Sequence, residues 1–424
     1  MYDVFSLPDI QFPEGFLWGS GTAGHQIEGM NIHSDFWADE QAKTGIFVNA
    51  DSVSGAACNH YEMVAEDVDL LTKLGHKAYR MSIEWARIEP QEGQFCEEAV
   101  QHYLDELQRL QEKNIKVFIT LVHFTVPAWF ARLGGISNPE NLPYFERYLH
   151  YILPRIAPYA YAWNVLNEFN LGFTEAHFVK KRSALRFHAR GYHIIKQYSD
   201  APVSSAHAFV QYTPKRPYDA FDPVMASYLD WSANGFFLHA IRTGEILLPF
   251  TEGEICEEVK GSLDFWAINM YTRTMADARK ANGFGERYRH KLLKMIPKDF
   301  YLEEMYPENM IAQLDRIHDR PIYITENGCS CDDDRFRIVY LSLYLNAIYE
   351  AMQMGADVRG YLYWSTMDNY EWGSFLPRFG LLNVDQNTFQ RTMKPSAYFY
   401  KEIIENNGFS QDILRKYLQE LPTL

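Results

Sequence analysis

The sequence predicts an α/β protein built as a single (β/α)8 TIM barrel. Short apolar runs of strand length recur along the 424 residues, stretches of helical periodicity separate them, and polar or aromatic side chains follow the runs directly. Parallel strands of a barrel open their C-terminal ends on one face, so these side chains would gather there. Because no linker, low-complexity tract or fixed repeat divides the chain, we expect one domain over residues 1–424.

The expected strands are rich in β-branched and aromatic residues and end at turn residues or polar side chains. In the seventh, Ile322 and Ile324 are apolar and β-branched, and Asn327-Gly328 is a turn signal that ends the strand. In chain order the eight strands are expected at residues 16–18, 77–83, 116–122, 162–168, 202–207, 263–269, 320–326 and 359–364.

Amphipathic stretches between these runs predict helices. The first has apolar Val64, Val68 and Leu71 at helical spacing, with Gly75 just past its end as a C-cap. A doubly wound sheet would use the same elements, but its site would lie at one switch point rather than draw on most strands. The helices are expected at residues 62–74, 99–112, 142–156, 183–198, 222–242, 335–354 and 394–406.

Composition and charge narrow the function classes. The hydrophobic fraction of 47% suits a large core. With an aromatic fraction of 15%, most rings would be in the core, and others could form a surface on which a carbohydrate stacks. A net charge of −15 argues against a nucleic-acid or anionic-membrane partner. Residues 1–13 show no secretory signal, no apolar run reaches membrane-span length, and five scattered cysteines do not form a disulfide pattern. We therefore expect a cytoplasmic protein.

Two motifs could suggest a cofactor, and neither has the context that a cofactor site needs. Residues 19–24 match G-x-G-x-x-G, but no sustained helical face follows, so we expect a tight loop that places Gln26 and Glu28 at the mouth of a site. Cys329-Ser330-Cys331 lacks zinc-ligand spacing, and a solvated acidic loop is expected there. We expect neither a metal nor another cofactor.

Two of the expected strands end in a carboxylate. Glu326 ends the strand at 320–326, and Glu168 ends the run at 162–168, directly after the amide of Asn167. A barrel would bring the two glutamates to one face, where paired carboxylates can cleave a glycosidic bond. Either glutamate alone could instead cap the helix that follows it.

Further polar or aromatic side chains follow the other expected strands. A surface loop, or for His123 a position in the core, would explain any one of them, but their repetition at most strand ends favours a shared site. The set comprises Gln26, Arg80, His123, Asn167, Asn269, Tyr271, Trp364, Glu371 and Trp372.

These residues lie in motifs that resemble family 1 of the glycoside hydrolases, the retaining β-glycosidases. The similarity extends over nearly the whole chain, and the motifs together are highly specific. They are residues 12–19 (FPEGFLWG), 26–29 (QIEG), 79–85 (YRMSIEW), 167–168 (NE), 269–271 (NMY), 325–328 (TENG), 364–372 (WSTMDNYEW) and 378–381 (RFGL).

The resemblance implies a β-glucosidase that needs no cofactor. It would remove the terminal β-D-glucosyl residue, and also β-galactosyl or β-fucosyl residues, from small β-glycosides or oligosaccharides by double displacement. Glu326 would be the nucleophile, Glu168 the acid/base, and Arg80 would keep Glu326 ionised. The substrate contacts implied are Gln26, His123, Asn167, Glu371 and Trp372 at the glycone hydroxyls, Trp364 as the stacking floor, and Asn269 and Tyr271 beside the nucleophile.

Some positions depart from the family pattern. Phe124-Thr125 replace the usual Trp-Asp, and Phe169 replaces the Pro after the acid/base, which puts the aglycone side in doubt. The chain is also short for the family. Residues 377–379 (PRF) replace the Lys-x-Tyr of the phosphoglycosidases, so we expect an unphosphorylated sugar. A transglycosidase, a 6-phospho-β-glucosidase, an inactive sugar-binding relative and a nicotinamide oxidoreductase remain as alternatives, although the presence of both glutamates disfavours an inactive relative.

Overall fold

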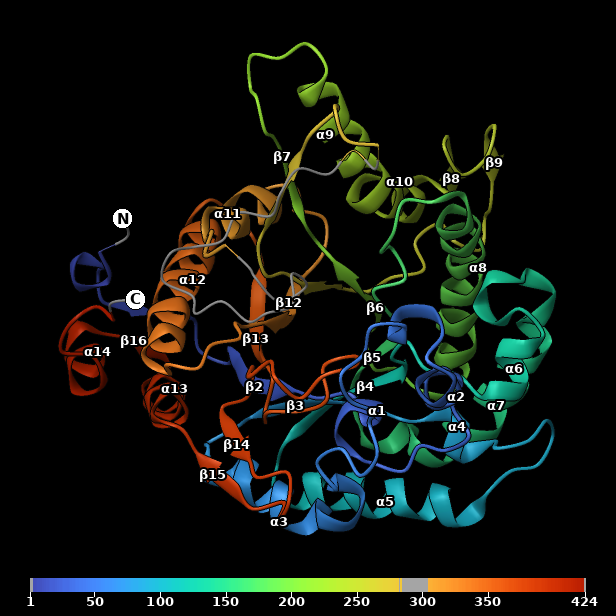
Figure 1. Ribbon diagram of the computed structural model, residues 1–424, viewed down its shortest axis with the longest axis horizontal. Coiled ribbons are helices and arrows are strands. Elements are labelled where there is room, and N and C mark those ends of the chain that lie inside the picture. The colour runs from blue at the N-terminus through green and yellow to red at the C-terminus, as the bar shows by residue number, and fades with distance from the viewer. Residues whose placement is uncertain (1–2, 282, 284–303, 423–424) are drawn as a thin grey trace.

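The eight expected strands close into one parallel barrel in the computed structural model, which describes residues 3–281, 283 and 304–422 (Figure 1). Each strand pairs with the next in the chain, and β13 pairs with β2 to complete the ring. The (β/α)8 prediction is confirmed. The barrel strands are β2 (Leu17–Gly21), β3 (Ala78–Ser82), β4 (Lys116–Val122), β5 (Ala160–Asn167), β6 (Val203–Ala208), β10 (Trp266–Asn269), β12 (Ile322–Asn327) and β13 (Val358–Trp364).

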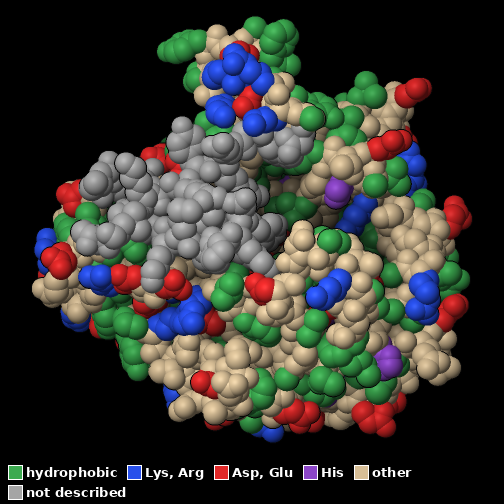
Figure 2. All heavy atoms as spheres, viewed as in Figure 1, with side chains coloured by type: hydrophobic (Ala, Val, Ile, Leu, Met, Phe, Trp, Pro, Cys, Tyr) green, Lys and Arg blue, Asp and Glu red, His purple; other side chains and the backbone are tan. Residues whose placement is uncertain are grey.

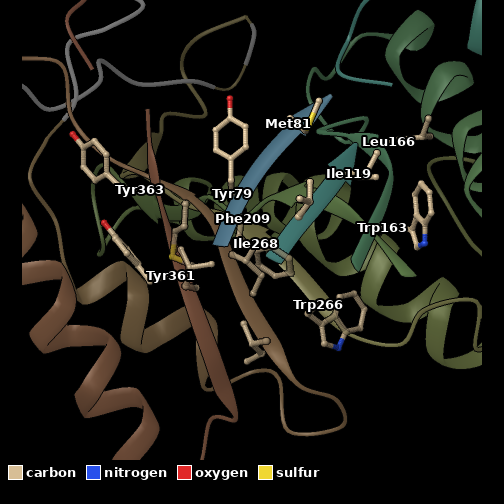
Figure 3. Packing of buried hydrophobic residues seen from close by; sticks show 14 of the residues in the cluster. Tyr79, Met81, Ile119, Trp163, Leu166, Phe209, Trp266, Ile268, Tyr361 and Tyr363 are labelled. Carbon is tan, nitrogen blue, oxygen red and sulfur yellow. The ribbon is translucent and has the colours of Figure 1, made fainter. Parts of the chain in front are cut away.

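Side chains alternate across the barrel wall, as the pleat of a strand requires. In β3, Ala78 belongs to a small cluster of barrel residues, whereas Tyr79 and Met81 belong to the large core between strands and helices (Figure 3). The barrel is tight at its base, because a Cβ on Gly19 would lie 1.9 Å from the carbonyl oxygen of Ala78. Glycine is required there for close packing of β2 on β3.

Helices surround the barrel in the order expected (Figure 1). One predicted helix start was wrong. The helix expected to begin at residue 183 begins earlier, at Glu175, with Thr174 as its N-cap. The helices that cover the barrel are α3 (His60–Lys73), α5 (Glu97–Glu112), α7 (Leu142–Ile156), α8 (Glu175–Tyr198), α12 (Arg335–Gln353) and α13 (Pro395–Asn406).

The helical segment expected over 222–242 is confirmed, as α9 (Asp222–Asp230), a π turn (Trp231–Gly235) and α10 (Phe236–Thr243) in unbroken succession. Two local features differ from the prediction. The sequence analysis did not predict α11 (Glu308–Leu314), the short helix that precedes β12. Residues 19–24 are not a loop, because β2 runs through Gly21 and a short helix, α1 (Gly24–Ile27), follows two residues later.

Small sheets extend the barrel. Strands β7 (Gln211–Pro214) and β11 (Arg273–Ala276) form a parallel pair beyond β6 and β10, and α9 packs against this pair. Strands β1 (Ile10–Gln11) and β16 (Gly408–Phe409) pair the two ends of the chain, which lie close together in Figure 1. The remaining pairs are β8 (Glu245–Ile246) with β9 (Glu254–Ile255) and β14 (Leu382–Val384) with β15 (Arg391–Met393).

Short helices lie between these elements and near the two ends of the chain. They are α2 (Asp35–Ala42), α4 (Trp85–Ile88), α6 (Ala128–Arg132), α14 (Gln411–Tyr417) and the 3-10 turns Val4–Ser6, Gly45–Phe47, Gly135–Ser137, Pro139–Asn141 and Ala157–Tyr159.

Among the described residues, none of the helices is long and apolar enough to cross a bilayer.

Candidate active site

The predicted site residues lie together at the C-terminal ends of the barrel strands. Seven lie in or just after the C-terminal halves of the strands: Arg80, His123, Asn167, Glu168, Asn269, Glu326 and Trp364. The others come from connections: Gln26 from α1, Tyr271 from the segment between β10 and β11, and Glu371 with Trp372 from the loop after β13. Viewed as in Figure 1, the surface of the molecule is hollowed near its centre (Figure 2).

Glu326 is a buried carboxylate, 4% exposed, held from two sides. The guanidinium of Arg80 donates from Nη1 to Oε1, and the Tyr271 hydroxyl donates to Oε2 at 2.7 Å. Burial, followed by the nearby Glu326 carboxylate, raises the pKa of Tyr271, so its hydroxyl remains a donor. Both oxygens of Glu326 therefore have a fixed partner, which sets the rotation of the carboxylate.

Glu168 is connected to Glu326 through amides. Arg80 Nη2 donates to Asn167 Oδ1 at 2.6 Å, and Asn269 Nδ2 donates both to that oxygen at 3.1 Å and to Glu168 Oε1 at 2.9 Å. The hydroxyl of Thr325, next to Glu326, donates to Asn269 Oδ1 at 2.7 Å and fixes the orientation of that amide. A continuous hydrogen-bonded path therefore joins the two carboxylates.

His123 presents an unused donor. Because Asn167 Oδ1 already accepts from Arg80, Asn167 must donate from Nδ2 to His123 Nε2, at 3.2 Å. Burial, and secondarily the charge of Arg80, lowers the pKa of His123 well below its usual value, so the ring is neutral with its proton on Nδ1. That nitrogen is buried and has no partner among the described residues. The ring lies nearly parallel to Trp364 and Trp372, with centroids 5.8 and 6.2 Å away.

Gln26 presents an unused acceptor. Its Nε2 donates to Asn369 Oδ1 at 3.1 Å and to the carbonyl oxygen of Tyr370 at 3.0 Å, whereas its buried Oε1 accepts nothing from the part of the chain that is described. Glu371, 4% exposed, accepts from the indole of Trp364 at 3.2 Å. These groups offer a donor, an acceptor and a carboxylate to a polyhydroxylated ligand.

The residues that depart from the family pattern have partners in the structure. Thr125 donates to the buried Glu84 at 2.7 Å. Phe124 has a positive φ of 67° and lies edge-on to Trp372 at 5.2 Å. Phe169 is buried in an aromatic cluster, edge-on to Phe237 at 5.1 Å. Each replacement is therefore accommodated beside the site and not within the path that joins the carboxylates.

The sequence analysis did not predict the buried hydrogen-bonded residues that support the site, and it placed one residue wrongly. Glu28 does not face the mouth of the site, because it pairs with Arg87 at 2.6 Å and accepts from the Tyr103 hydroxyl at 2.9 Å. Glu84, fully buried, accepts from Asn31 at 2.8 Å; burial and then the charge of Glu28 raise the pKa of Glu84. Glu84 lies within a family motif, but only the fold reveals its partners.

Comparison with known proteins identifies the family of the chain. The model of the family described as "Glycosyl hydrolase family 1" matches residues 9–409. A 1,4-beta-D-glucan glucohydrolase of Thermotoga neapolitana is 29% identical over 94% of this chain and 99% of its own. A beta-galactosidase of Sulfolobus acidocaldarius is 28% identical over 98% of this chain and 99% of its own.

Solved structures give the same result. A beta-glycosidase from Pyrococcus horikoshii superposes with a TM-score of 0.86 and is 32% identical, covering 96% of this chain and 98% of its own. A family 1 β-glucosidase from Thermotoga maritima in complex with isofagomine lactam has a TM-score of 0.85 and 28% identity, over 95% of this chain and 100% of its own.

Proposed function

The chain belongs to glycosyl hydrolase family 1 and is a β-glycosidase, and from this premise we propose that Glu326 is its nucleophile and Glu168 its acid/base. The reaction is retaining hydrolysis of a terminal β-D-glucosyl residue by two displacements. The observation that carries this proposal is the hydrogen-bonded path that runs from Glu326 through Arg80, Asn167 and Asn269 to Glu168.

In the first step, Glu326 attacks the anomeric carbon and Glu168 gives its proton to the leaving oxygen. The Arg80 guanidinium pairs with the Glu326 carboxylate that makes the attack, and the Tyr271 hydroxyl orients it. The amide of Asn269 donates to Oε1 of Glu168 and orients this carboxyl for protonation of the glycosidic oxygen. The products of this step are a glycosyl ester of Glu326 and a free aglycone alcohol.

In the second step, water takes the place of the aglycone. The first step leaves Glu168 as a carboxylate, and formation of the ester removes the negative charge of Glu326, so Glu168 no longer faces a neighbouring carboxylate and stays ionised. As a base, Glu168 takes a proton from water, which attacks the anomeric carbon and frees Glu326. Two inversions at one carbon give net retention.

The glycone is recognised by the unused groups of the site. The proton on His123 Nδ1 and the acceptor Gln26 Oε1 suit sugar hydroxyls, since buried polar groups without partners gain most from a ligand. The indole of Trp364 offers a face for stacking and fixes Glu371. A carboxylate at this place accepts from an equatorial or an axial O4 hydroxyl, so we expect both β-glucosides and β-galactosides to be cleaved, glucosides better.

The acid role is tested by Glu168→Gln with two leaving groups. An unactivated phenyl β-glucoside needs protonation, whereas a 2,4-dinitrophenyl β-glucoside needs little. We expect kcat/KM to fall at least about a hundredfold for the phenyl substrate and much less for the activated one. Equal losses on both substrates would contradict the acid role.

Sugar preference is tested with Glu371→Gln and three aryl substrates: β-glucoside, β-galactoside and β-glucoside 6-phosphate. A charge-assisted hydrogen bond contributes about 1.5–3 kcal/mol, so the variant should lose roughly 10- to 100-fold in kcat/KM on both neutral sugars. The wild type should reject the phosphorylated sugar, because its phosphate would meet the Glu371 carboxylate. A wild-type preference for the 6-phosphate, or an unchanged variant, would overturn the assignment.

A further inference from the structure

The backbone of Glu168 is strained, and the residues after it hold the strain in place. Glu168 has a φ of +46°, in the left-handed region that side chains with a Cβ rarely adopt. Such a conformation persists only where the surrounding structure fixes it from several sides. On one side, the Glu168 N–H donates to the carbonyl oxygen of Ala206 in β6 at 2.8 Å. The other side depends on the next two residues.

Asn170, two residues after Glu168, is buried at 1% exposure and bridges two elements. Its amide pairs with the main chain of Ala208 at the end of β6: Nδ2 donates to the carbonyl at 2.8 Å, and Oδ1 accepts from the N–H at 3.1 Å. The same Nδ2 donates to the carbonyl of Ala233 at 3.2 Å. Asn170 therefore fastens the chain after Glu168 both to the barrel and to the π turn Trp231–Gly235.

The π turn is itself fixed from the barrel and from α8. The ring of His207, in β6, contacts the carbonyl oxygen of Ala233 through Nε2 at 2.8 Å. The ammonium of Lys181, fully buried in α8, donates to the carbonyl oxygen of Ser232 at 2.8 Å. Two successive carbonyls of the turn thus accept side-chain hydrogen bonds, which makes it a rigid support for Asn170.

Phe169, between Glu168 and Asn170, packs its ring against the residues that directly follow the π turn. Its ring is 4% exposed and lies edge-on to Phe237 at 5.1 Å and to Phe236 at 6.2 Å, the first two residues after the π turn. Edge-to-face contact is a favoured aromatic geometry. A proline at this position would restrict the backbone by its ring; phenylalanine instead restricts it by packing.

We propose that Asn170 is a positioning residue for proton transfer, holding the strained Glu168 against the π turn so that its carboxyl meets the leaving oxygen. This inference rests on the proposed role of Glu168 as the acid/base. The side chain of Asn170 bonds to the main chain of Ala208 and Ala233, so it would act through Glu168 rather than on the substrate. Because the general acid must be within hydrogen-bond reach of the oxygen, a small displacement of this loop weakens protonation.

The test measures a ratio that does not depend on how much of each preparation is folded. For each enzyme, kcat/KM for phenyl β-glucoside is divided by kcat/KM for 2,4-dinitrophenyl β-glucoside. In Asn170→Ala we expect this ratio to fall about tenfold, because only the phenyl substrate needs a well-placed acid. Asn170→Asp has nearly the same shape but lacks the NH2 donor, and should lower the ratio similarly.

Asn141→Ala is the matched control. Asn141 is also buried, and its Nδ2 also donates to two main-chain carbonyls, those of Leu133 at 3.0 Å and Gly135 at 2.9 Å, but in the segment before α7. We expect it to lower thermal stability and leave the ratio unchanged. Equal ratios in Asn170→Ala, Asn141→Ala and wild type would overturn the proposal.

Glu168→Gln, measured in the same way, separates the two hypotheses. If it fails to lower the ratio, the acid role of Glu168 is wrong. If it lowers the ratio and the Asn170 variants do not, only the positioning role is wrong.

Discussion

Two buried arginines hold carboxylates in this protein, and their surroundings differ. Arg391 pairs with Asp67 of α3 through Nε at 2.7 Å and Nη2 at 2.9 Å. Its remaining donors reach the carbonyls of Cys58 and Phe389 and the sulfur of Met63, and His60 completes the cluster by contacting the same aspartate at 2.8 Å. Every nitrogen of Arg391 thus has a partner, as a structural ion pair requires.

The surroundings of Arg80 are left incomplete. Its Nε has no partner among the described residues, and neither do Gln26 Oε1 and His123 Nδ1 nearby. Unpaired buried groups cost free energy, and they are typical of sites that a ligand completes. This contrast is consistent with the role proposed for Arg80 in catalysis and with a structural role for Arg391.

The largest expected effect is the loss of activity in Glu326→Gly. Without a nucleophile the glycosyl ester cannot form, so kcat/KM on aryl β-glucosides should fall on the order of 10⁴-fold or more. Azide supplied in the cavity should restore turnover and give an α-glycosyl azide, the inverted product. Retained activity in the purified variant would remove Glu326 from this role.

A smaller effect, on stability alone, is expected when the other arginine loses its partner. Asp67→Asn leaves Arg391 with an uncompensated buried charge, which should lower the free energy of unfolding by about 3 kcal/mol or more. Activity per folded molecule should be unchanged. Asp69→Asn is the control on the same helix, because its pair with Lys113 is exposed on both sides and screened by water. If Asp67→Asn lowered kcat/KM instead, the contrast between the two arginines would fail.

A pH dependence of stability, with no effect on catalysis, is expected in the Arg391 cluster. Burial disfavours the charged ring of His60, but the carboxylates of Glu106 and Asp67 outweigh it and raise the pKa of His60 from 6.5 to about 10. Its stabilising contribution is therefore complete below about pH 6.5 and is lost as the pH rises through about 10. Relative to wild type, His60→Gln should be least stable near pH 6, with the difference shrinking toward pH 10. A difference that stays constant in denaturant titrations would contradict this.

Much of the barrel could be predicted because its strands are strongly apolar and end at recognisable polar residues. The errors lie where the local signal is weak or ambiguous. Helix α8 starts earlier than expected because its capping box uses His177 where a Glu or Gln is usual. The π turn at Trp231–Gly235 has the apolar spacing of a continuous helix, so periodicity could not reveal it. Helix α11 was not predicted because it is only seven residues long, so its helical periodicity gives a weak signal.

The site could be predicted in its charged residues but not in its connections. Glu168 and Glu326 each end an apolar run, which marks them in the sequence. The amide of Asn269 that joins them, and the bridge that Asn170 makes to Ala233, depend on contacts between residues far apart in the chain. Glu28 shows the opposite error, since it stands beside site residues in sequence yet faces Arg87.

Trapping the covalent intermediate tests the central claim most directly. A 2,4-dinitrophenyl 2-deoxy-2-fluoro-β-glucoside forms the glycosyl ester but hydrolyses slowly, because the fluorine destabilises the oxocarbenium-like transition states. Intact-protein mass and peptide mapping should show one fluoroglucosyl group on Glu326, and the parent substrate should release β-glucose first. A label on another carboxylate would contradict the assignment of Glu326, and no label together with release of α-glucose would contradict the retaining mechanism.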